Sequence, residues 1–372
     1  MKKIGFLTSS RADFGIYLPL LYKLREDKDF EVKIIAFGTH LSSFHGYTIS
    51  QIEEAGFDVA YKIESMLLTD LPSSISTSMG LTTIKFSDFW MNHVNDFDLI
   101  FCLGDRYEMF SAVIAGVPFQ IPFAHLHGGE TTLGAIDNVF RHSITMASKY
   151  HFVSTELHAQ KVIQLINQKD NVYNVGALSL DNLLNLKLLT INEFESKWGI
   201  DLNKKTILTT FHPETINLAS NKRNINNLVS AIKSLSAYQF LITMPNADTA
   251  GNMIRNILKE NFEKSDRIYL IENLGSQSYF TALKYASLLL GNTSSGIIEA
   301  ASFGKYVINL GDRQLGRSSG NNIIHIPVEE TEIIRAVAEI EGLNIDKMEN
   351  IYFNGGATTK IINVLKTVFN ND

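Results

Sequence analysis

The sequence predicts an α/β protein of two domains, each built around a parallel sheet. Its 372 residues exceed the usual size of a single hydrophobic core. Short apolar runs of strand length alternate with helical patterns through both halves, which is typical of parallel βαβ units. Hydrophobic residues make up 45 % of the chain and charged residues 19 %, as in folded globular proteins.

The first half alternates strands and helices from its beginning. We expect strands at residues 2–10, 30–38, 98–104, 121–129 and 150–155. Helical patterns occupy about 14–26, 48–55, 109–115, 139–147 and 157–166. The stretch 71–83 is rich in Ser and Thr, and we expect it to form a mobile or partner-contacting loop.

The second half repeats the pattern after a change of register near residues 171–186. Strands are expected at 205–213, 238–246, 267–273, 287–295, 306–311 and 322–327, with a helix at 296–302. A last apolar helix at 358–369 either packs back on a domain or serves an oligomer interface. We therefore expect an N-terminal Rossmann-like domain at 1–172, a C-terminal Rossmann-like domain at 173–355, and a C-terminal helical segment at 356–372.

Charge and cysteine content exclude several classes of protein. The net charge is −6 and no basic block stands out, so we expect no nucleic-acid partner. No run of about 18 apolar residues predicts a membrane span, and the apolar run at 4–8 is too short for a signal peptide, so a cytoplasmic location is expected. The single cysteine, Cys102, lies in an apolar strand and is interpreted as a buried structural thiol rather than a nucleophile.

Polar strings follow two strands of the first half. In GDRYE, Asp105 follows a buried strand, where a carboxylate either accepts a proton or caps the next helix. In HLHGGE, two glycines permit a tight turn that crowds His125, His127 and Glu130 into one pocket. The two histidines also suit a metal, but no third ligand stands at a familiar spacing.

The segment after HLHGGE carries further charged residues. Asp137 stands just before an amphipathic helix and is either its N-cap or a third carboxylate of the site. Arg141 and His142 lie one turn later and either support an anionic site or form a solvated helix face.

The second half ends its strands in a similar way. FHPET places His212 and Glu214 after a strand, where a lone His is otherwise ordinary polar surface. GNTSSG offers hydroxyl groups and glycines ahead of a helix, a pattern suited to holding an anion. Glu299 is placed to accept hydrogen bonds from ribose hydroxyls, and GDRQLGR adds two guanidiniums that suit a pyrophosphate.

Ligands of open parallel sheets bind beyond the carboxyl ends of the strands, where these strings fall. The sequence therefore predicts a site in the cleft between the two domains. It contains neither GxGxxG at its amino end nor GxxxxGKS, which argues against a dinucleotide dehydrogenase and against a P-loop ATPase.

Taken together, SSRADFG, GDRYE, HLHGGE with RHSIT, FHPET, NADT, GNTSSG and GDRQLGR resemble the hydrolysing UDP-N-acetylglucosamine 2-epimerases of bacterial sialic acid synthesis. The resemblance runs from about residue 3 to about residue 328. It implies a glycosyltransferase B type fold, with two Rossmann-like domains and the UDP-sugar in the cleft between them.

The resemblance also implies a reaction. Such enzymes convert UDP-N-acetylglucosamine and water to N-acetylmannosamine and UDP, by elimination to 2-acetamidoglucal followed by hydration. Two proton-transfer groups are then required, one on each face of the sugar. No nicotinamide or other cofactor and no metal is implied, and a homodimer or homotetramer is expected.

Site roles follow from the resemblance, residue by residue. Asp105 and Glu130 are the expected proton-handling groups, Asp137 supports them, and His212 steadies or protonates the departing pyrophosphate. The substrate-binding residues are expected to be Arg11, Ser294 and Arg313 for the phosphates, Thr293 and Glu299 for the nucleoside, and His127, Ser295, Gly296 and Arg317 around them.

Four alternatives remain at this stage. A hydrolysing 2-epimerase for UDP-N,N'-diacetylbacillosamine, of legionaminic acid synthesis, differs only in the shape of its sugar pocket. A non-hydrolysing 2-epimerase typically carries HVEAG where this chain has HLHGG. A glycosyltransferase of the same fold requires an acceptor, and a catalytically silent sugar-nucleotide sensor requires none of the acids.

Overall fold

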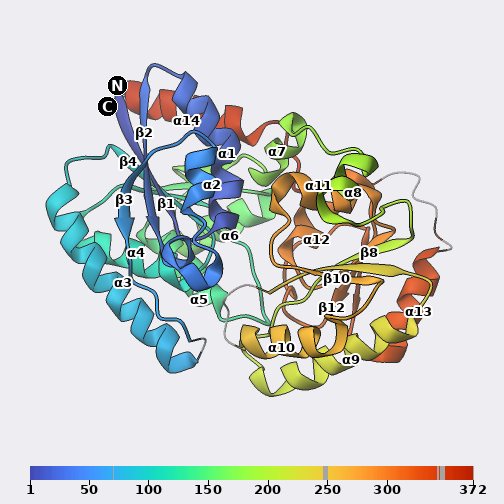
Figure 1. Cartoon of the computed structure of the whole chain (residues 1–372). Helices are drawn as coiled ribbons and strands as arrows, with labels where there is room; N and C mark the ends of the chain where they lie inside the picture. Colours follow the sequence, from blue (N-terminus) through green and yellow to red (C-terminus); the bar gives the residue numbers. More distant parts are fainter. Residues whose placement is uncertain (70, 246–249, 342, 344–347, 372) are drawn as a thin grey trace. The chain divides into compact units, whose positions relative to one another are not determined.

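The computed structural model describes every residue except 70, 246–249, 342, 344–347 and 372. The chain forms two compact α/β units (Figure 1). Unit 1 comprises residues 1–130, 137–184 and 352–372, and unit 2 comprises residues 131–136 and 185–351. The chain therefore changes unit near residue 184 rather than at the expected residue 172, and the short segment 131–136 belongs by its contacts to unit 2.

Unit 1 is built on a parallel sheet of seven strands in the order β3-β2-β1-β4-β5-β6-β7. The strands are β1 Lys2–Thr8, β2 Phe30–Phe37, β3 Val59–Ile63, β4 Leu99–Leu103, β5 Phe123–Leu126, β6 Tyr150–Val153 and β7 Val172–Asn174. The five expected strands are present, and β3 and β7 are added at the two edges. The order reverses between β1 and β4, as in a Rossmann fold.

Helices cover both faces of this sheet. They are α1 Arg11–Glu26, α2 Ile49–Glu54, α3 Pro72–His93, α4 Tyr107–Gly116, α5 Asp137–Ala147, α6 Glu156–Ile166, α7 Ser179–Asn185 and α14 Ala357–Asn371, with 3-10 turns η1 Gly38–Leu41, η2 Ser43–His45 and η3 Val117–Phe119. Alternate residues of β1 feed two cores: Ile4 and Phe6 pack with α1, α2 and α14, whereas Leu7 packs with α3, α4 and α5. The buried Cys102 belongs to the second core, as expected for a structural thiol.

The expected loop at 71–83 is wrong, because α3 begins at Pro72 and runs through this stretch. Proline suits the first turn of a helix, and the buried Phe86, Phe89 and Trp90 supply an apolar face that packs on the sheet. The hydroxyl of Thr82 donates to Ser65 Oγ at 2.7 Å, so even a polar residue of this face has a buried partner. Tertiary packing outweighs the weak helix propensity of Ser and Thr.

The C-terminal helix α14 packs back on unit 1. Ile361 and Leu365 are buried in the core that contains α1, and the amides of Ala357 and Thr358 donate to the Asp181 carboxylate at 3.1 and 2.6 Å. Asp181 therefore serves as a cap for this helix. Both chain ends consequently lie side by side on unit 1 (Figure 1).

Unit 2 repeats the architecture with a parallel sheet of six strands in the order β10-β9-β8-β11-β12-β13. All were expected: β8 Thr206–Thr210, β9 Gln239–Thr243, β10 Ile268–Ile271, β11 Leu288–Gly291, β12 Val307–Leu310 and β13 Ile323–Ile326. The helical segments are α8 Ile191–Trp198, η4 Leu218–Ser220, α9 Asn221–Ser234, α10 Gly251–Phe262, α11 Gly275–Tyr285, α12 Ser294–Ile298, η5 Ala300–Phe303 and α13 Glu330–Glu341. The expected helix at 296–302 is thus a short helix followed by a 3-10 turn.

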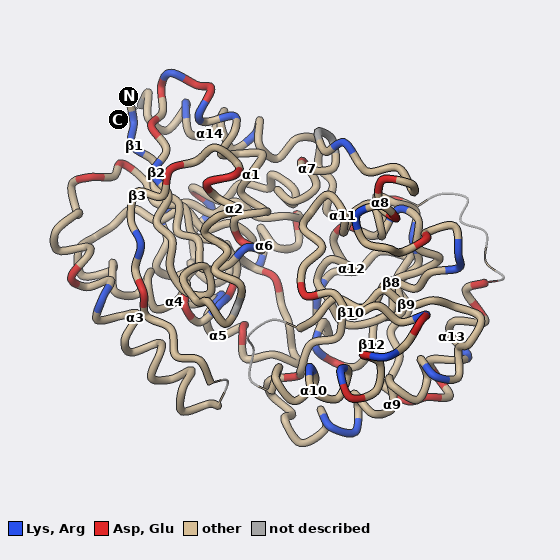
Figure 2. The backbone as a smooth tube through the Cα atoms, viewed as in Figure 1, with Lys and Arg blue, Asp and Glu red and all other residues tan. Residues whose placement is uncertain are grey.

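Basic and acidic residues are scattered over the helices and loops of both units (Figure 2). Among the helices that the structure describes, none combines the length and the apolar character needed to cross a membrane.

Candidate active site

Polar strings follow both strands of the topological switch point in each sheet, where ligands of such folds bind, and HLHGGE and GDRQLGR follow the next strand of their sheets. In unit 1, Arg11 follows β1 and Asp105 follows β4, which are neighbours across the switch. In unit 2, His212 follows β8 and Thr293 follows β11, which occupy the equivalent positions.

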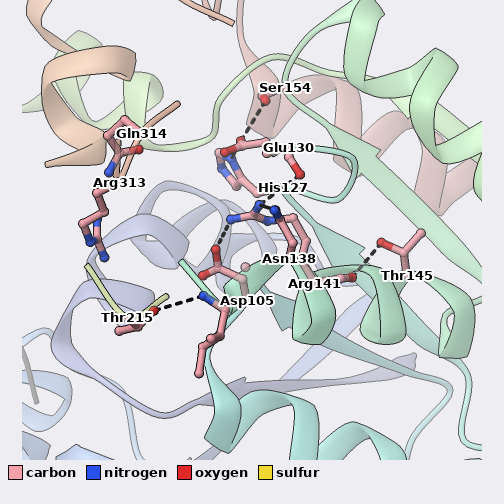
Figure 3. A network of polar contacts seen from close by, with 12 residues as sticks. Asp105, His127, Glu130, Asn138, Arg141, Thr145, Ser154, Thr215, Arg313 and Gln314 are labelled. Atoms are coloured by element: carbon pink, nitrogen blue, oxygen red, sulfur yellow. Dashed lines mark hydrogen bonds and ion pairs between the residues drawn. The ribbon is translucent and has the colours of Figure 1, made fainter. Parts of the chain in front are cut away.

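Asp105 is held by a buried arginine. The Arg141 side chain is 1 % exposed and forms an ion pair with the Asp105 carboxylate, which is 22 % exposed (Figure 3). Arg141 Nη1 also donates to the Glu130 carbonyl at 2.9 Å and to Asn138 Oδ1 at 3.3 Å. The solvated-face alternative for Arg141 is therefore wrong: this residue joins the loops after β4 and β5.

Asp105 does not cap α4. The N-cap of that helix is Arg106, without a side-chain cap bond, and the Arg106 guanidinium instead donates to the buried Glu108 at 2.8 and 3.2 Å. The Asp105 carboxylate is thus left partly accessible at the carboxyl end of β4.

His127 and Glu130 point toward each other (Figure 3). His127 Nδ1 lies 2.9 Å from Glu130 Oε1, and their side chains are 10 % and 2 % exposed. The Ser154 hydroxyl, after β6, donates to the same oxygen at 3.1 Å and contacts His158 Nδ1 at 2.9 Å. The carboxylate is therefore satisfied from two sides.

The glycines of HLHGGE make this geometry possible. Gly129 has φ +79°, and a Cβ there would lie 2.4 Å from the His158 carbonyl oxygen. His127 itself adopts φ +63°, in the left-handed region that few non-glycine residues enter. The turn therefore requires glycine at position 129, and it holds His127 in a strained backbone conformation.

His125 is part of the support rather than a metal ligand. Its Nε2 lies 2.8 Å from the Gly104 carbonyl and its Nδ1 lies 3.0 Å from Thr145 Oγ1. Since a carbonyl only accepts, Nε2 carries the hydrogen, and burial lowers the pKa of His125 to about 3. Within the described residues, no group of three His, Cys, Asp or Glu side chains could hold a metal ion.

Two further expected residues begin helices of unit 1. Arg11 is the first residue of α1, after the N-cap Ser10, whose side chain accepts from the Asp13 amide. Asp137 is the first residue of α5, in the same turn as Asn138, which contacts Arg141.

In unit 2, one asparagine joins the loops after β8 and β11. The fully buried Asn292 accepts from the His212 amide at 2.7 Å and donates to the His212 carbonyl at 2.9 Å. A second asparagine, Asn221, exchanges the same pair of bonds with Glu214, both at 2.9 Å. Two asparagine side chains therefore hold the backbone of the loop that carries His212.

Gly291 ends β11 with φ +144°, and a Cβ there would lie 2.0 Å from the Thr210 carbonyl oxygen. The two strands of the switch point approach too closely for any other residue. Thr293 then caps α12 by accepting from the Ser295 amide. The expected residues Thr293, Ser294 and Ser295 are partly exposed, whereas Gly296 and Glu299 are buried.

GDRQLGR is attached to the same loops. Arg313 and Gln314 donate to the Asn292 carbonyl at 3.3 and 2.8 Å, and the Asp312 amide donates to the Glu214 carboxylate at 2.9 Å. Arg317 follows in the next turn and is partly exposed.

The segment 131–136 completes unit 2. Its Leu133 amide donates to the Leu315 carbonyl at 2.8 Å, and its Ile136 amide donates to Thr215 Oγ1 at 3.0 Å (Figure 3).

The sequence does not predict the supporting roles of Asn292, Asn221 and Ser154, because these roles depend on side-chain bonds between loops that are distant along the chain. The motif NADT lies outside the described residues.

Comparison with known proteins identifies the same family as the motifs did. A family model for UDP-N-acetylglucosamine 2-epimerase matches residues 22–366. The chain is 37 % identical to the polysialic acid biosynthesis protein P7 of Escherichia coli, covering 98 % of this chain and 94 % of the relative. It is 32 % identical to the hydrolysing UDP-N,N'-diacetylbacillosamine 2-epimerase of Legionella pneumophila, covering 99 % and 96 %.

Solved structures share the fold. UDP-GlcNAc 2-epimerase from Neisseria meningitidis, bound to UDP-GlcNAc, superposes with a TM-score of 0.82 at 19 % identity, covering 98 % of this chain and 100 % of that chain. The Methanocaldococcus jannaschii UDP-GlcNAc 2-epimerase, in complex with UDP-GlcNAc and UDP, gives 0.80 at 16 % identity, covering 98 % and 99 %. The expected glycosyltransferase B type fold is confirmed, and the chain belongs to the UDP-N-acetylglucosamine 2-epimerase family.

Proposed function

We propose that this chain is a hydrolysing 2-epimerase that converts UDP-N-acetylglucosamine and water to N-acetylmannosamine and UDP, for sialic acid synthesis. One observation carries the proposal. In unit 1, the buried guanidinium of Arg141 bonds both the partly exposed carboxylate of Asp105 and the backbone of Glu130, whose side chain pairs with His127. Proton transfer at two faces of one carbon requires two such groups.

The reaction proceeds in two steps, an elimination and a hydration. A base removes the C2 proton, the electrons of the C2–H bond form the C1=C2 double bond, and the C1–O bonding pair leaves with UDP. Water then adds to C1 of the 2-acetamidoglucal while C2 receives a proton on the opposite face. Asp105 and the Glu130–His127 pair handle these protons in the proposal, with Asp137 in support.

Unit 2 carries residues that suit UDP. Ser294 and Arg313 bind the phosphates in this proposal, and His212 steadies the pyrophosphate as it departs. Thr293 and Glu299 bind the nucleoside, with Ser295, Gly296 and Arg317 beside them. The bonds through Asn292 support this assignment, because they hold the His212 loop and Arg313 at one strand end.

The name of the Escherichia coli relative favours a sialic acid product. The second candidate substrate is UDP-N,N'-diacetylbacillosamine, which is favoured by the names of the Legionella relative and of a Campylobacter jejuni relative 36 % identical over 332 residues. We also propose a homo-oligomer, since α3 exposes the apolar side chains of Ile84 and Met91 by 69 % and 60 %.

Acceptor-free release of UDP from the two sugar nucleotides tests the proposal. We expect kcat/KM for UDP-N-acetylglucosamine to exceed that for the diacetylbacillosamine nucleotide by about tenfold or more, because the extra substituents must be excluded by the pocket. The reverse preference would assign the alternative substrate. Formation of UDP-N-acetylmannosamine would contradict hydrolysis, and a requirement for an acceptor would indicate a glycosyltransferase.

A further inference from the structure

The contact between His127 and Glu130 fixes the tautomer of the imidazole. An ionised carboxylate only accepts hydrogen bonds, so the 2.9 Å contact places a hydrogen on His127 Nδ1. In the neutral ring, Nε2 then carries a free lone pair. A carboxylate behind one ring nitrogen is the usual way in which proteins orient the other nitrogen for chemistry.

His127 Nε2 has no hydrogen-bond partner among the described residues, although the atom is buried. A buried polar atom without a partner is uncommon and calls for an explanation. The residue also adopts the left-handed backbone conformation at φ +63°. A strained backbone and an unsatisfied basic atom occur together at the carboxyl end of β5, which is where a ligand of this sheet binds.

The Glu130 carboxylate, by contrast, is occupied. Its Oε1 atom accepts hydrogen bonds from His127 Nδ1 and from the Ser154 hydroxyl, and the residue is 1 % exposed. Its backbone carbonyl is bound by Arg141. Glu130 is therefore placed to orient the imidazole rather than to reach a substrate itself.

We propose that His127 is the base that removes the C2 proton of the sugar nucleotide, and that Glu130 is its positioning residue. This inference rests on the proposed function and assigns one of its two proton transfers. The Nε2 lone pair takes the proton, the C2–H electrons form the C1=C2 bond, and UDP leaves with the C1–O pair. The resulting imidazolium keeps its Nδ1–H bond to the Glu130 carboxylate, which stabilises the new positive charge.

Other titratable groups surround this pair. His125 lies on the preceding strand, His158 contacts Ser154 on the far side of Glu130, and the Arg141–Asp105 ion pair lies beyond the Glu130 carbonyl. The return of a proton to C2 is assigned to Asp105, on the neighbouring loop.

His127→Asn is the first variant to test, because Asn tolerates the left-handed conformation but does not accept a proton at neutral pH. Turnover is followed as incorporation of solvent deuterium at C2 together with release of UDP. We expect kcat to fall about 10²–10⁴-fold, with the dissociation constant of UDP unchanged within about threefold. His127→Gln is the second variant, in case the first fails to fold by circular dichroism.

Glu130→Gln distinguishes positioning from a purely structural role. We expect the acidic limb of the kcat/KM profile to move to lower pH, because an amide stabilises the imidazolium less than a carboxylate does. In His127→Asn this limb should be absent. The matched control is His93→Asn, which disrupts a partly exposed His–Asp pair with Asp96 at 2.7 Å and should leave activity within about twofold.

Two outcomes would overturn the assignment while leaving the proposed function intact: His127→Asn turning over within threefold of the wild type, or Glu130→Gln losing all activity while His127→Asn retains it. If the wild type releases UDP from neither sugar nucleotide, the proposed function fails and this assignment fails with it.

Discussion

Replacing Arg141 with Met should destabilise unit 1 and release Asp105. Arg141 is the largest buried charged side chain of the first unit, at 1 % exposed, and it bonds Asp105, the Glu130 carbonyl and Asn138. Methionine preserves an unbranched chain but provides no donor. The variant therefore removes the charge and three hydrogen bonds with little change in packing volume.

The expected cost follows from the burial of the two partners. Removing one member of a fully buried ion pair costs about 3–5 kcal/mol, because the other charge is left unpaired. The Asp105 side chain is 22 % exposed and keeps some water, so we expect the lower end, about 3 kcal/mol. An exposed pair gives the matched control: Arg335→Met, at 63 % exposed beside Glu332, should cost less than about 0.5 kcal/mol.

Urea unfolding followed by tryptophan fluorescence measures this cost. The chain has two tryptophans, Trp90 and Trp198, so a Trp198→Phe background leaves only the buried Trp90 of unit 1 as reporter. In a double-mutant cycle with Asp105→Asn, the two changes should be non-additive by about 2 kcal/mol. Additivity within about 0.5 kcal/mol, or a cost for Arg141→Met equal to that of Arg335→Met, would show that the Arg141–Asp105 pair does not stabilise unit 1.

Three further predictions concern the frame of the site. Gly291→Ala should destabilise the chain by about 3 kcal/mol, because its Cβ would lie 2.0 Å from the Thr210 carbonyl oxygen, whereas Gly275→Ala, with open space around its Cβ, should cost about 1 kcal/mol in the same urea assay. Asp181→Ala should cost about 1–2 kcal/mol by removing the cap of α14, seen as faster amide exchange in that helix and nowhere else in unit 1. Burial lowers the pKa of His125 to about 3, whereas the unfolded chain takes up this proton near pH 6.5. The free energy of unfolding should therefore fall by about 1.4 kcal/mol per pH unit as the pH drops from 6.5 towards 3. His125→Gln should flatten that slope.

The strands that carry the site were predictable because they are continuous apolar runs buried on both faces. All six strands of unit 2 and five of the seven in unit 1 were predicted from apolar runs, although the edge strands β10 and β13 are only partly buried. β3 and β7 lack a clear run, because Lys62 interrupts β3 and β7 is only three residues long. The sequence predicted a loop at the start of α3 because Ser and Thr have weak helix propensity and the apolar residues of this helix are widely spaced.

The site was predictable as a set of residues but not as a set of partners. The sequence places Asp105, His127 and Glu130 after neighbouring strands, and the structure joins them through Arg141. That Glu130 turns to His127, with Ser154 behind it, depends on side-chain directions within the turn. These side-chain directions cannot be predicted from the spacing of residues in the sequence.

Proton NMR of the wild-type enzyme with UDP-N-acetylglucosamine in deuterated water distinguishes elimination and hydration from other routes. We predict free UDP and N-acetylmannosamine that carries deuterium at C2, formed without any acceptor. N-acetylmannosamine that retains its original C2 hydrogen, or a product still attached to UDP, would contradict elimination and hydration at this site.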